Sequence, residues 1–207
     1  MFILIKPDLE HLPSYVGALK KDWSPNNLRT AEEAREHLAK IEEDVAAFVD
    51  NLDDPEAKAG PVILPDGSQV QRLPGYARWM WDGEFCGAIG FRWKPGTTEL
   101  PPTCLGHIGY SVVPWKRGRG YAKQALGLLL QQIDIPGLDF IDITADTSNI
   151  ASHKVITGNN GVFIERFTAP ASLGGKETLR YRIHLPVGKS NRPDAQLVSP
   201  IARKTAE

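Results

Sequence analysis

The sequence predicts a single α/β domain built around a mixed, mostly antiparallel sheet of about six to seven strands, flanked by about four helices. Two observations lead to this fold class. The apolar period changes along the chain, from helical to strand-like and back. In addition, a strand, a helix and a second strand follow one another between residues 108 and 145, which is the order of a crossover connection.

The first part of the chain predicts one strand and two helices. A short apolar run at residues 2–5 ends before a proline and predicts the strand. Apolar residues then recur at three- and four-residue intervals over residues 9–23 and again over residues 30–52, which predicts two amphipathic helices. Thr30 and Glu33 have the spacing of a capping box, so we expect Thr30 to cap the second helix.

The middle of the chain changes to a strand period. The turn signal Trp81-Asp82-Gly83 separates two aromatic and apolar runs and predicts a hairpin of residues 77–81 and 84–93. Residues 108–113 form a further apolar run that ends at a proline and predicts a strand. The remaining expected elements are a helix over 120–133, a strand over 140–145, a helix over 149–156 and strands over 162–167 and 178–185.

Composition limits the kinds of protein that this chain can be. It has 207 residues, of which 42% are apolar and 24% charged, and its formal net charge is −1. These values are ordinary for one globular domain, which we place at residues 1–185, and they give no basic field for nucleic acid or an anionic membrane. Residues 186–207 are polar and show no period, so we expect a mobile tail there.

The sequence also lacks the features of a membrane protein or a metalloprotein. No stretch is apolar for long enough to span a bilayer, and the chain begins without a signal-peptide pattern, so we expect a cytoplasmic protein. Cys86 and Cys104 lie in separate apolar contexts and are expected as reduced thiols rather than as a disulfide. No cluster of cysteine and histidine has zinc-binding spacing, so no metal site is expected.

The segment from Tyr110 to Lys123 has the composition of a phosphate-binding turn between a strand and a helix. Gly118 and Gly120 allow the backbone to pass close to a ligand and to adopt positive φ. The first free N–H groups of the following helix carry about half a positive charge and bind phosphate readily. Four cations add to this within a short stretch: Lys116, Arg117, Arg119 and Lys123. We therefore predict a site for a ligand with two or more phosphates.

Three known phosphate patterns can be compared with this segment. A Walker loop requires a Gly-Lys-Ser/Thr triplet, and the chain has none at that spacing. A dinucleotide loop requires a third small residue where this chain has Lys123. The pattern Arg117-x-x-Gly120-x-Ala122 does match a known signature, and Pro114 precedes Arg117 by three residues. It resembles the acetyl-CoA signature of the GNAT acetyltransferase superfamily, Gln/Arg-x-x-Gly-x-Gly/Ala.

A second segment resembles the other cofactor motif of the same family. Asn149 opens a short helix that contains Ser152, and a turn rich in glycine and asparagine follows, with Phe163 after it. The resemblance implies that Asn149 bonds the pantetheine arm or its neighbouring backbone, and that Ser152 faces the same arm. Asn149 can equally be the N-terminal cap of that helix. The strand order extends the resemblance over most of residues 1–185.

The resemblance implies acetyl-CoA as the cofactor, held between two strands, ending at Val113 and Ala145, that splay apart. An N–H group near Val112 or Val113 would polarise the thioester carbonyl, a contact worth about 2.7–4 kcal/mol in the transition state. Pantetheine would bond the backbone of the first strand, and the loop would hold the pyrophosphate. The cofactor-binding residues expected on this basis are Tyr110, Ser111, Val112, Val113, Arg117, Gly118, Arg119, Gly120, Tyr121, Ala122, Lys123, Asn149 and Ser152.

The implied reaction is N-acetyl transfer by direct attack of an amine in a ternary complex, which needs a base for the amine and an acid for the leaving thiolate. Many family members place a tyrosine acid seven residues after the asparagine, where this chain has Ile156. Tyr110 and Tyr121 lie near the cofactor loop in sequence, and Tyr110 is our candidate for the catalytic tyrosine.

His107, at the start of the central strand, is the base that we expect, because the ordinary pKa of histidine lies near 6.5. Glu84 at the hairpin turn and Asp146 at the end of a strand are alternatives. Each also has a structural interpretation. A histidine at a strand end is often hydrogen-bonded or solvated, a glutamate after a turn is commonly exposed, and the aspartate can bond the loop backbone.

The acceptor is expected opposite the cofactor, where the hairpin places Trp79, Trp81, Phe85 and Trp93. These aromatic residues can be core pairs or a wall for an apolar or cationic acceptor. The acceptor can be a small-molecule amine or a peptide amine, and the chain can form a homodimer. Because Ile156 replaces the tyrosine acid, a second hypothesis is a non-catalytic acyl-CoA-binding or sensing module. A third, a nucleotide-binding protein, requires ADP to bind as well as coenzyme A does.

Overall fold

The computed structural model describes residues 1–185, so the predicted tail at 186–207 lies outside the described residues. Its strands are β1 Ile3–Ile5, β2 Asp53–Asp54, β3 Val62–Ile63, β4 Gln69–Val70, β5 Gly75–Trp81, β6 Phe85–Arg92, β7 Ile108–Val112, β8 Phe140–Asp146, β9 Val162–Thr168 and β10 Glu177–His184. Its α-helices are α1 Leu12–Leu19, α2 Thr30–Glu43, α3 Val45–Asp50, α4 Tyr121–Leu130 and α5 Ile150–Thr157.

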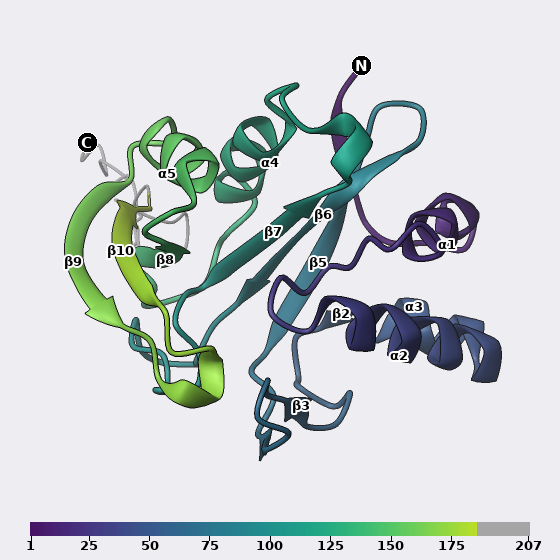
Figure 1. Cartoon of the computed structure of the whole chain (residues 1–207), viewed down its shortest axis with the longest axis horizontal. Helices are drawn as coiled ribbons and strands as arrows, with labels where there is room; N and C mark the ends of the chain where they lie inside the picture. Colours follow the sequence, from purple (N-terminus) through teal and green to yellow (C-terminus); the bar gives the residue numbers. More distant parts are fainter. Residues whose placement is uncertain (186–207) are drawn as a thin grey trace, which may run out of the picture.

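Two main antiparallel sheets form the centre of the fold (Figure 1). The larger has the path β1-β5-β6-β7, with β2 also paired to β5, and the smaller has the order β8-β10-β9. The α/β class and the mostly antiparallel pairing are as predicted. The expected mixed sheet is not seen in residues 1–185, because the two strands of the crossover, β7 and β8, belong to different sheets.

The predicted helix over residues 30–52 is in fact two helices. They meet at Asp44, whose backbone is extended (φ −154°, ψ 100°) and whose carboxylate accepts a hydrogen bond from Ala47 N–H at 2.9 Å. Thr30 does not cap α2, since the N-cap residue is Arg29. Glu33 forms an ion pair with Arg29 at 3.3 Å. The capping-box prediction is therefore wrong, because the Glu33 side chain pairs with Arg29 and does not bond the N-terminus of the helix.

Helices cover both faces of the larger sheet (Figure 1). Helices α1, α2 and α3 pack on the face that carries Trp79, Ala88 and Val113, which we call the α1 face. The strand register places Ser111 beside Ala88 on this same face. Helix α4 packs against the opposite face, where Ile89 lies in a core shared with the smaller sheet.

The two sheets meet where β7 begins. His107 N–H donates to the Asp142 carbonyl oxygen at 2.7 Å, and Asp142 N–H donates to His107 Nδ1 at 3.0 Å. Beyond this junction no ladder joins β7 to β8 within the described residues, and the two strands belong to separate sheets (Figure 1). This is the splayed pair of strands that the family resemblance implied.

Two further observations concern the described part of the chain. Cys86 is buried and Cys104 half-buried, and both are free thiols as predicted. Burial raises the pKa of Cys86 to about 12, so this thiol stays protonated near neutral pH. None of the helices in residues 1–185 has both the length and the apolar character needed to cross a membrane.

Candidate cofactor and acceptor site

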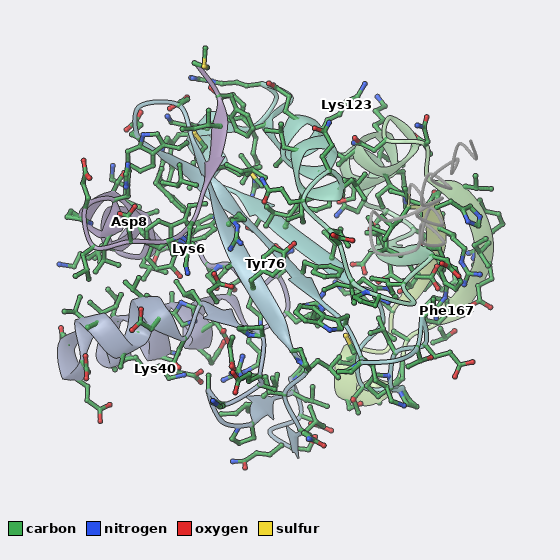
Figure 2. The ribbon with its side chains drawn as sticks, turned by 180° about the vertical axis from the view of Figure 1, so that it is seen from behind. Lys6, Asp8, Lys40, Tyr76, Lys123 and Phe167 are labelled. Atoms are coloured by element: carbon green, nitrogen blue, oxygen red, sulfur yellow. The ribbon has the colours of Figure 1, made fainter. Side chains whose placement is uncertain are left out.

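The loop after β7 connects the end of this strand to the start of α4. Gly118 and Gly120 adopt left-handed backbone, with φ of 78° and 76°. Gly120 is the N-cap of α4, and among residues 1–185 no side chain caps this end of the helix. The first N–H groups of α4 therefore remain available beside the exposed Arg117 and Arg119, which is an arrangement that binds phosphate. Lys123 projects to the surface near the same end of the helix (Figure 2).

One edge of β7 is paired with β6, and the other faces the space between the sheets. Val113 N–H donates to the Cys86 carbonyl oxygen at 3.0 Å and so belongs to the paired edge. Successive main-chain groups of a strand alternate between its edges, so the Val112 N–H points to the open edge. Of the two N–H groups considered as an oxyanion donor, Val112 thus has the suitable direction.

Two side chains bond the open edge of β7. Arg117 Nε donates to the Val112 carbonyl oxygen at 3.2 Å, and Asn27 Nδ2 donates to the Tyr110 carbonyl oxygen at 3.1 Å. Asn27 belongs to the loop between α1 and α2, residues 20–29. Trp23 lies in the same loop, and its Nε1 donates to Ser111 Oγ at 3.0 Å. Sequence reasoning missed this loop, because an asparagine in a turn has no pattern that indicates a long-range partner.

The side chains of Tyr110 and Ser152 approach each other between the two sheets. The Tyr110 hydroxyl is buried and has no well-aligned hydrogen-bond partner among the described residues. Burial raises the pKa of Tyr110, and the nearby Ser152 hydroxyl offsets part of that rise. A buried hydroxyl without a partner costs free energy, so its position fits a site that a polar ligand completes.

Asn149 has the structural role that we considered for it. Its Oδ1 accepts a hydrogen bond from Ser152 N–H at 3.1 Å and caps the start of α5. This cap fixes the first turn of α5 and with it the position of Ser152 next to Tyr110. Ile156 is fully buried in the core, so the departure from the family pattern does not leave a polar group at that position.

Lys116 does not contribute to the phosphate site, because it is turned into the protein. Its side chain is 4% exposed, and Nζ lies 2.5 Å from Asp82 and 2.9 Å from Glu84. The Tyr121 hydroxyl donates to the same Asp82 carboxylate at 2.5 Å. Burial alone would raise the pKa of Asp82, but the hydrogen bonds from Lys116 and Tyr121 outweigh it and hold this pKa well below its usual value.

The three candidate bases lie apart from one another. Glu84 is 66% exposed and paired with Lys116, and Asp146 forms an ion pair with Lys176 at 3.1 Å. His107 is 1% exposed at the opposite end of β7 from Val112, a separation of about 16 Å along the strand. Burial lowers the pKa of His107. The structure therefore does not bring His107 together with the Val112 N–H.

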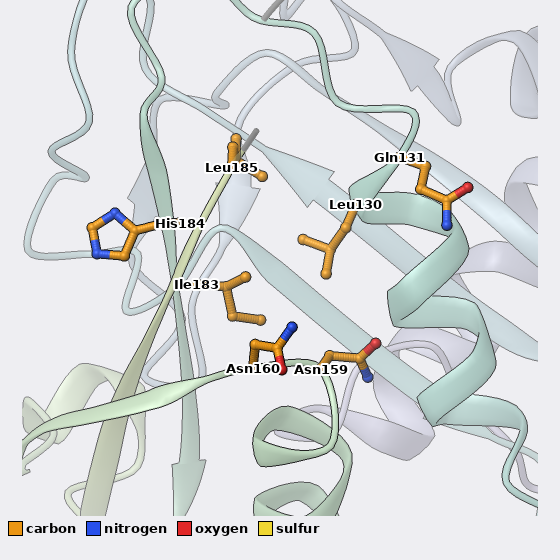
Figure 3. A pocket seen from close by; sticks show the side chains of 7 residues that line it. All are labelled: Leu130, Gln131, Asn159, Asn160, Ile183, His184 and Leu185. Carbon is orange, nitrogen blue, oxygen red and sulfur yellow. The ribbon is translucent and has the colours of Figure 1, made fainter. Parts of the chain in front are cut away.

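Two hollows in the described surface lie away from the phosphate loop. A cavity of ≈ 370 Å³ lies at the far end of α4 and is lined by Leu130, Gln131, Asn159, Asn160, Ile183, His184 and Leu185 (Figure 3). The length of α4 separates it from Gly120 by about 15 Å. A second cavity of ≈ 400 Å³ is lined in part by His107, Asp142 and Arg182, at the junction of the two sheets. Neither cavity includes the loop that we assign to phosphate.

Comparison with solved structures finds the same fold in several acetyltransferases. They include RimL, the ribosomal L7/L12 alpha-N-protein acetyltransferase, in complex with coenzyme A, with a TM-score of 0.57, 15% identity and coverage of 89% of this chain and 94% of that chain. Mycobacterium smegmatis RimJ in complex with CoA-disulfide gives a TM-score of 0.56 and 16% identity. The match covers 88% of this chain and 81% of that chain. The microcin C7 self-immunity acetyltransferase MccE, in complex with acetyl-CoA and AMP, gives a TM-score of 0.56 and 12% identity. The match covers 88% of this chain and 92% of that chain.

No curated protein sequence shows significant similarity to the chain. A family model described as an acetyltransferase (GNAT) domain matches residues 2–159, which include the splayed strands, the glycine loop and the Asn149 cap. The chain therefore belongs to the GNAT acetyltransferase family, whose members are N-acetyltransferases that use acetyl-CoA.

Proposed function

We propose that this protein acetylates the α-amine of a peptide or protein, with acetyl-CoA held between β7 and β8. One observation supports the cofactor position above all others. The start of α4, which no side chain of the described residues caps, follows a loop with both glycines in left-handed backbone, and the strand before that loop carries the buried Tyr110 hydroxyl, which has no partner in the same part of the chain. The name of RimL, an alpha-N-protein acetyltransferase, favours a protein α-amine, and the half-buried part of the α1 face beside Arg92, described below, favours the same kind of acceptor.

The cofactor would be held by groups that the structure leaves available. The N–H groups from Gly118 to Lys123 would hold the pyrophosphate, with Arg117 and Arg119 as its cations. The open edge of β7 would hold the pantetheine arm, with Tyr110 and Ser152 beside it. Tyr121 would contribute only its N–H, because its side chain bonds Asp82. Ser111 and Val113 would support the site only by pairing β7 with β6, because their side chains lie on the α1 face.

The chain supplies an oxyanion donor and an acid. Acetyl-CoA provides a thioester, whose carbonyl carbon forms the new bond to the amine nitrogen while the carbon–sulfur bond breaks and its electron pair stays on sulfur. Val112 N–H would stabilise charge on the carbonyl oxygen. Tyr110 would give its proton to the thiolate and regain one, through water, from the acetylated nitrogen. Its raised pKa keeps this hydroxyl protonated at neutral pH, as an acid requires.

The identity of the base stays a prediction. The burial of His107 and its distance from Val112 do not favour it, and Glu84 is held by Lys116. Asp146 ends β8 and therefore lies on the side of the junction where the two strands have separated. The homodimer and the cytoplasmic location also stay predictions.

We expect Tyr110→Phe to lower kcat at least a hundredfold in an assay that follows release of the coenzyme A thiol with a peptide bearing a free α-amine. The substitution removes only the acid hydroxyl, so the dissociation constant of coenzyme A should change less than threefold. Tyr181→Phe is the matched control, because Tyr181 lies on β10 of the smaller sheet and its hydroxyl bonds His153 of α5 at 3.2 Å.

An unchanged kcat in the Tyr110→Phe protein would show that another group protonates the thiolate. A wild-type protein that binds coenzyme A but releases no thiol with any amine would contradict the proposed transfer. That result would instead favour the non-catalytic binding module.

A further inference from the structure

Arg92, the last residue of β6, lies on the α1 face of the larger sheet. Ala88 packs on that face, and Gly90 and Arg92 follow it at the two-residue period of the strand. Arg92 Nε donates to the Gly106 carbonyl oxygen at 2.9 Å. One Nη atom lies 3.3 Å from the position that a Cβ would take at Gly109 on β7. The missing side chain at Gly109 thus makes room for the guanidinium above the sheet.

The guanidinium of Arg92 has no carboxylate partner among the described residues. Four other half-buried arginines do have one, namely Arg29, Arg78, Arg180 and Arg182, whereas Arg72 bonds the Gly60 carbonyl oxygen. Asp142, a buried carboxylate near the same junction, accepts two hydrogen bonds from the Arg182 guanidinium, at 2.8 and 2.9 Å. A half-buried cation that lacks a protein partner can bind an anionic group of a ligand.

Arg92 also lies at a defined distance from the predicted reaction centre. Gly109 precedes Val112 by three residues on β7, which corresponds to about 10 Å along the strand. Two loops border the surface between them. Asn27 contacts the edge of β7 at Tyr110, and the neighbouring Leu28 lies 3.9 Å from the Cβ position of Gly174 in the β9–β10 loop.

The backbone beside Arg92 is partly accessible. Ala77, Gly90 and Gly109 form the floor of the α1 face beside Arg92, and all three are half-buried rather than covered by the helices. In an extended peptide the third residue lies about 7 Å from the first, and its side chain reaches farther. An amine near Val112 and a carboxylate on the third residue therefore match the distance to Arg92.

We propose that Arg92 is a specificity-determining residue that binds an acidic side chain near the N-terminus of the acceptor peptide. The proposal rests on the proposed function, since it assumes a peptide α-amine at the Val112 edge. The planar guanidinium can donate two parallel hydrogen bonds to a carboxylate, which an amide of equal size cannot accept in the same way. The preferred acceptors are peptides with aspartate or glutamate at the third position.

The test compares two amidated tetrapeptides, Ser-Ala-Asp-Ala and Ser-Ala-Asn-Ala, as acceptors. We expect the wild-type protein to prefer the aspartate peptide at least tenfold in kcat/KM, mainly through KM, and Arg92→Gln to reduce this ratio to less than twofold. Arg92→Lys keeps the charge and should retain part of the preference. Arg78→Gln is the matched control, because Arg78 lies on the opposite face of β5 and is paired with Asp53.

Isothermal titration of both peptides into protein loaded with coenzyme A gives a second measurement that does not require turnover. Tighter binding of the aspartate peptide, lost in Arg92→Gln and kept in Arg78→Gln, would support the proposal. Equal binding of the two peptides, or a preference that survives Arg92→Gln in a folded variant, would overturn it. If the aspartate peptide binds through Arg92 but no thiol is released, the proposed transfer fails while the binding role of Arg92 stands.

Discussion

Replacing Gly120 with valine should weaken the binding of coenzyme A by more than tenfold. Gly120 has φ of 76°, which a β-branched residue adopts only at a cost of about 1–2 kcal/mol. The space around it is open, with Gln124 Nε2 at 3.8 Å as the nearest atom to an added Cβ. The effect must therefore arise from the backbone, which relaxes to negative φ and turns the N–H groups of the loop away from the pyrophosphate.

Gly137 provides the matched control for this substitution. It has φ of 78°, and no atom of the described residues lies within 4 Å of an added Cβ, but it is in the turn between α4 and β8. Valine at either position should lower thermal stability by a similar amount. Isothermal titration should show weaker binding in Gly120→Val alone. Equal coenzyme A affinities in the two variants would place the phosphate site elsewhere.

Replacing Lys116 with methionine should reduce the free energy of unfolding by about 3 kcal/mol, because it leaves the Asp82 carboxylate without its cation. The Lys116 side chain is 4% exposed and that of Asp82 16%, so water can replace the ammonium group only in part. Denaturant unfolding followed by fluorescence measures the change. Lys176→Met is the control, since Lys176 is 64% exposed in its pair with Asp146 and should contribute less than about 1 kcal/mol.

The same network predicts how stability depends on pH. The pKa of Asp82 is depressed in the folded protein, so its contribution is present above the unfolded value of 3.8 and is lost as pH falls below it. Lys116→Met removes the main cause of that depression. The variant should therefore lose less stability than the wild type between about pH 5 and pH 2. Parallel stability curves for the two proteins would contradict the assignment of this ion pair.

Periodicity and local pattern were sufficient to predict the main elements of the fold. Each helix and strand that defines the cofactor cleft, from β7 through α5, lies within a few residues of its expected place. The loop glycines were predictable because positive φ leaves a local signal in the sequence. The break at Asp44 was not predictable. Asp44 caps α3 directly after α2 ends, and the residues around it have the apolar period of one continuous helix.

Side-chain partners across the chain could not be read from the sequence. Lys116 belongs by composition to the basic loop, yet Asp82 and Glu84 on the β5–β6 hairpin turn hold it inside the protein. His107 was expected as a base, and its burial follows from the junction with β8, which depends on three-dimensional packing. Asn27 and Arg92 became candidates only when the strand register placed β6, β7 and the α1–α2 loop together.

The most direct measurement is a crystal structure of the protein with coenzyme A bound. The account predicts pyrophosphate oxygens within hydrogen-bonding distance of the N–H groups from Gly118 to Lys123, and the sulfur beside the Tyr110 hydroxyl and Ser152. Coenzyme A bound instead in the cavity at the far end of α4, or with its pyrophosphate away from Gly120, would contradict it.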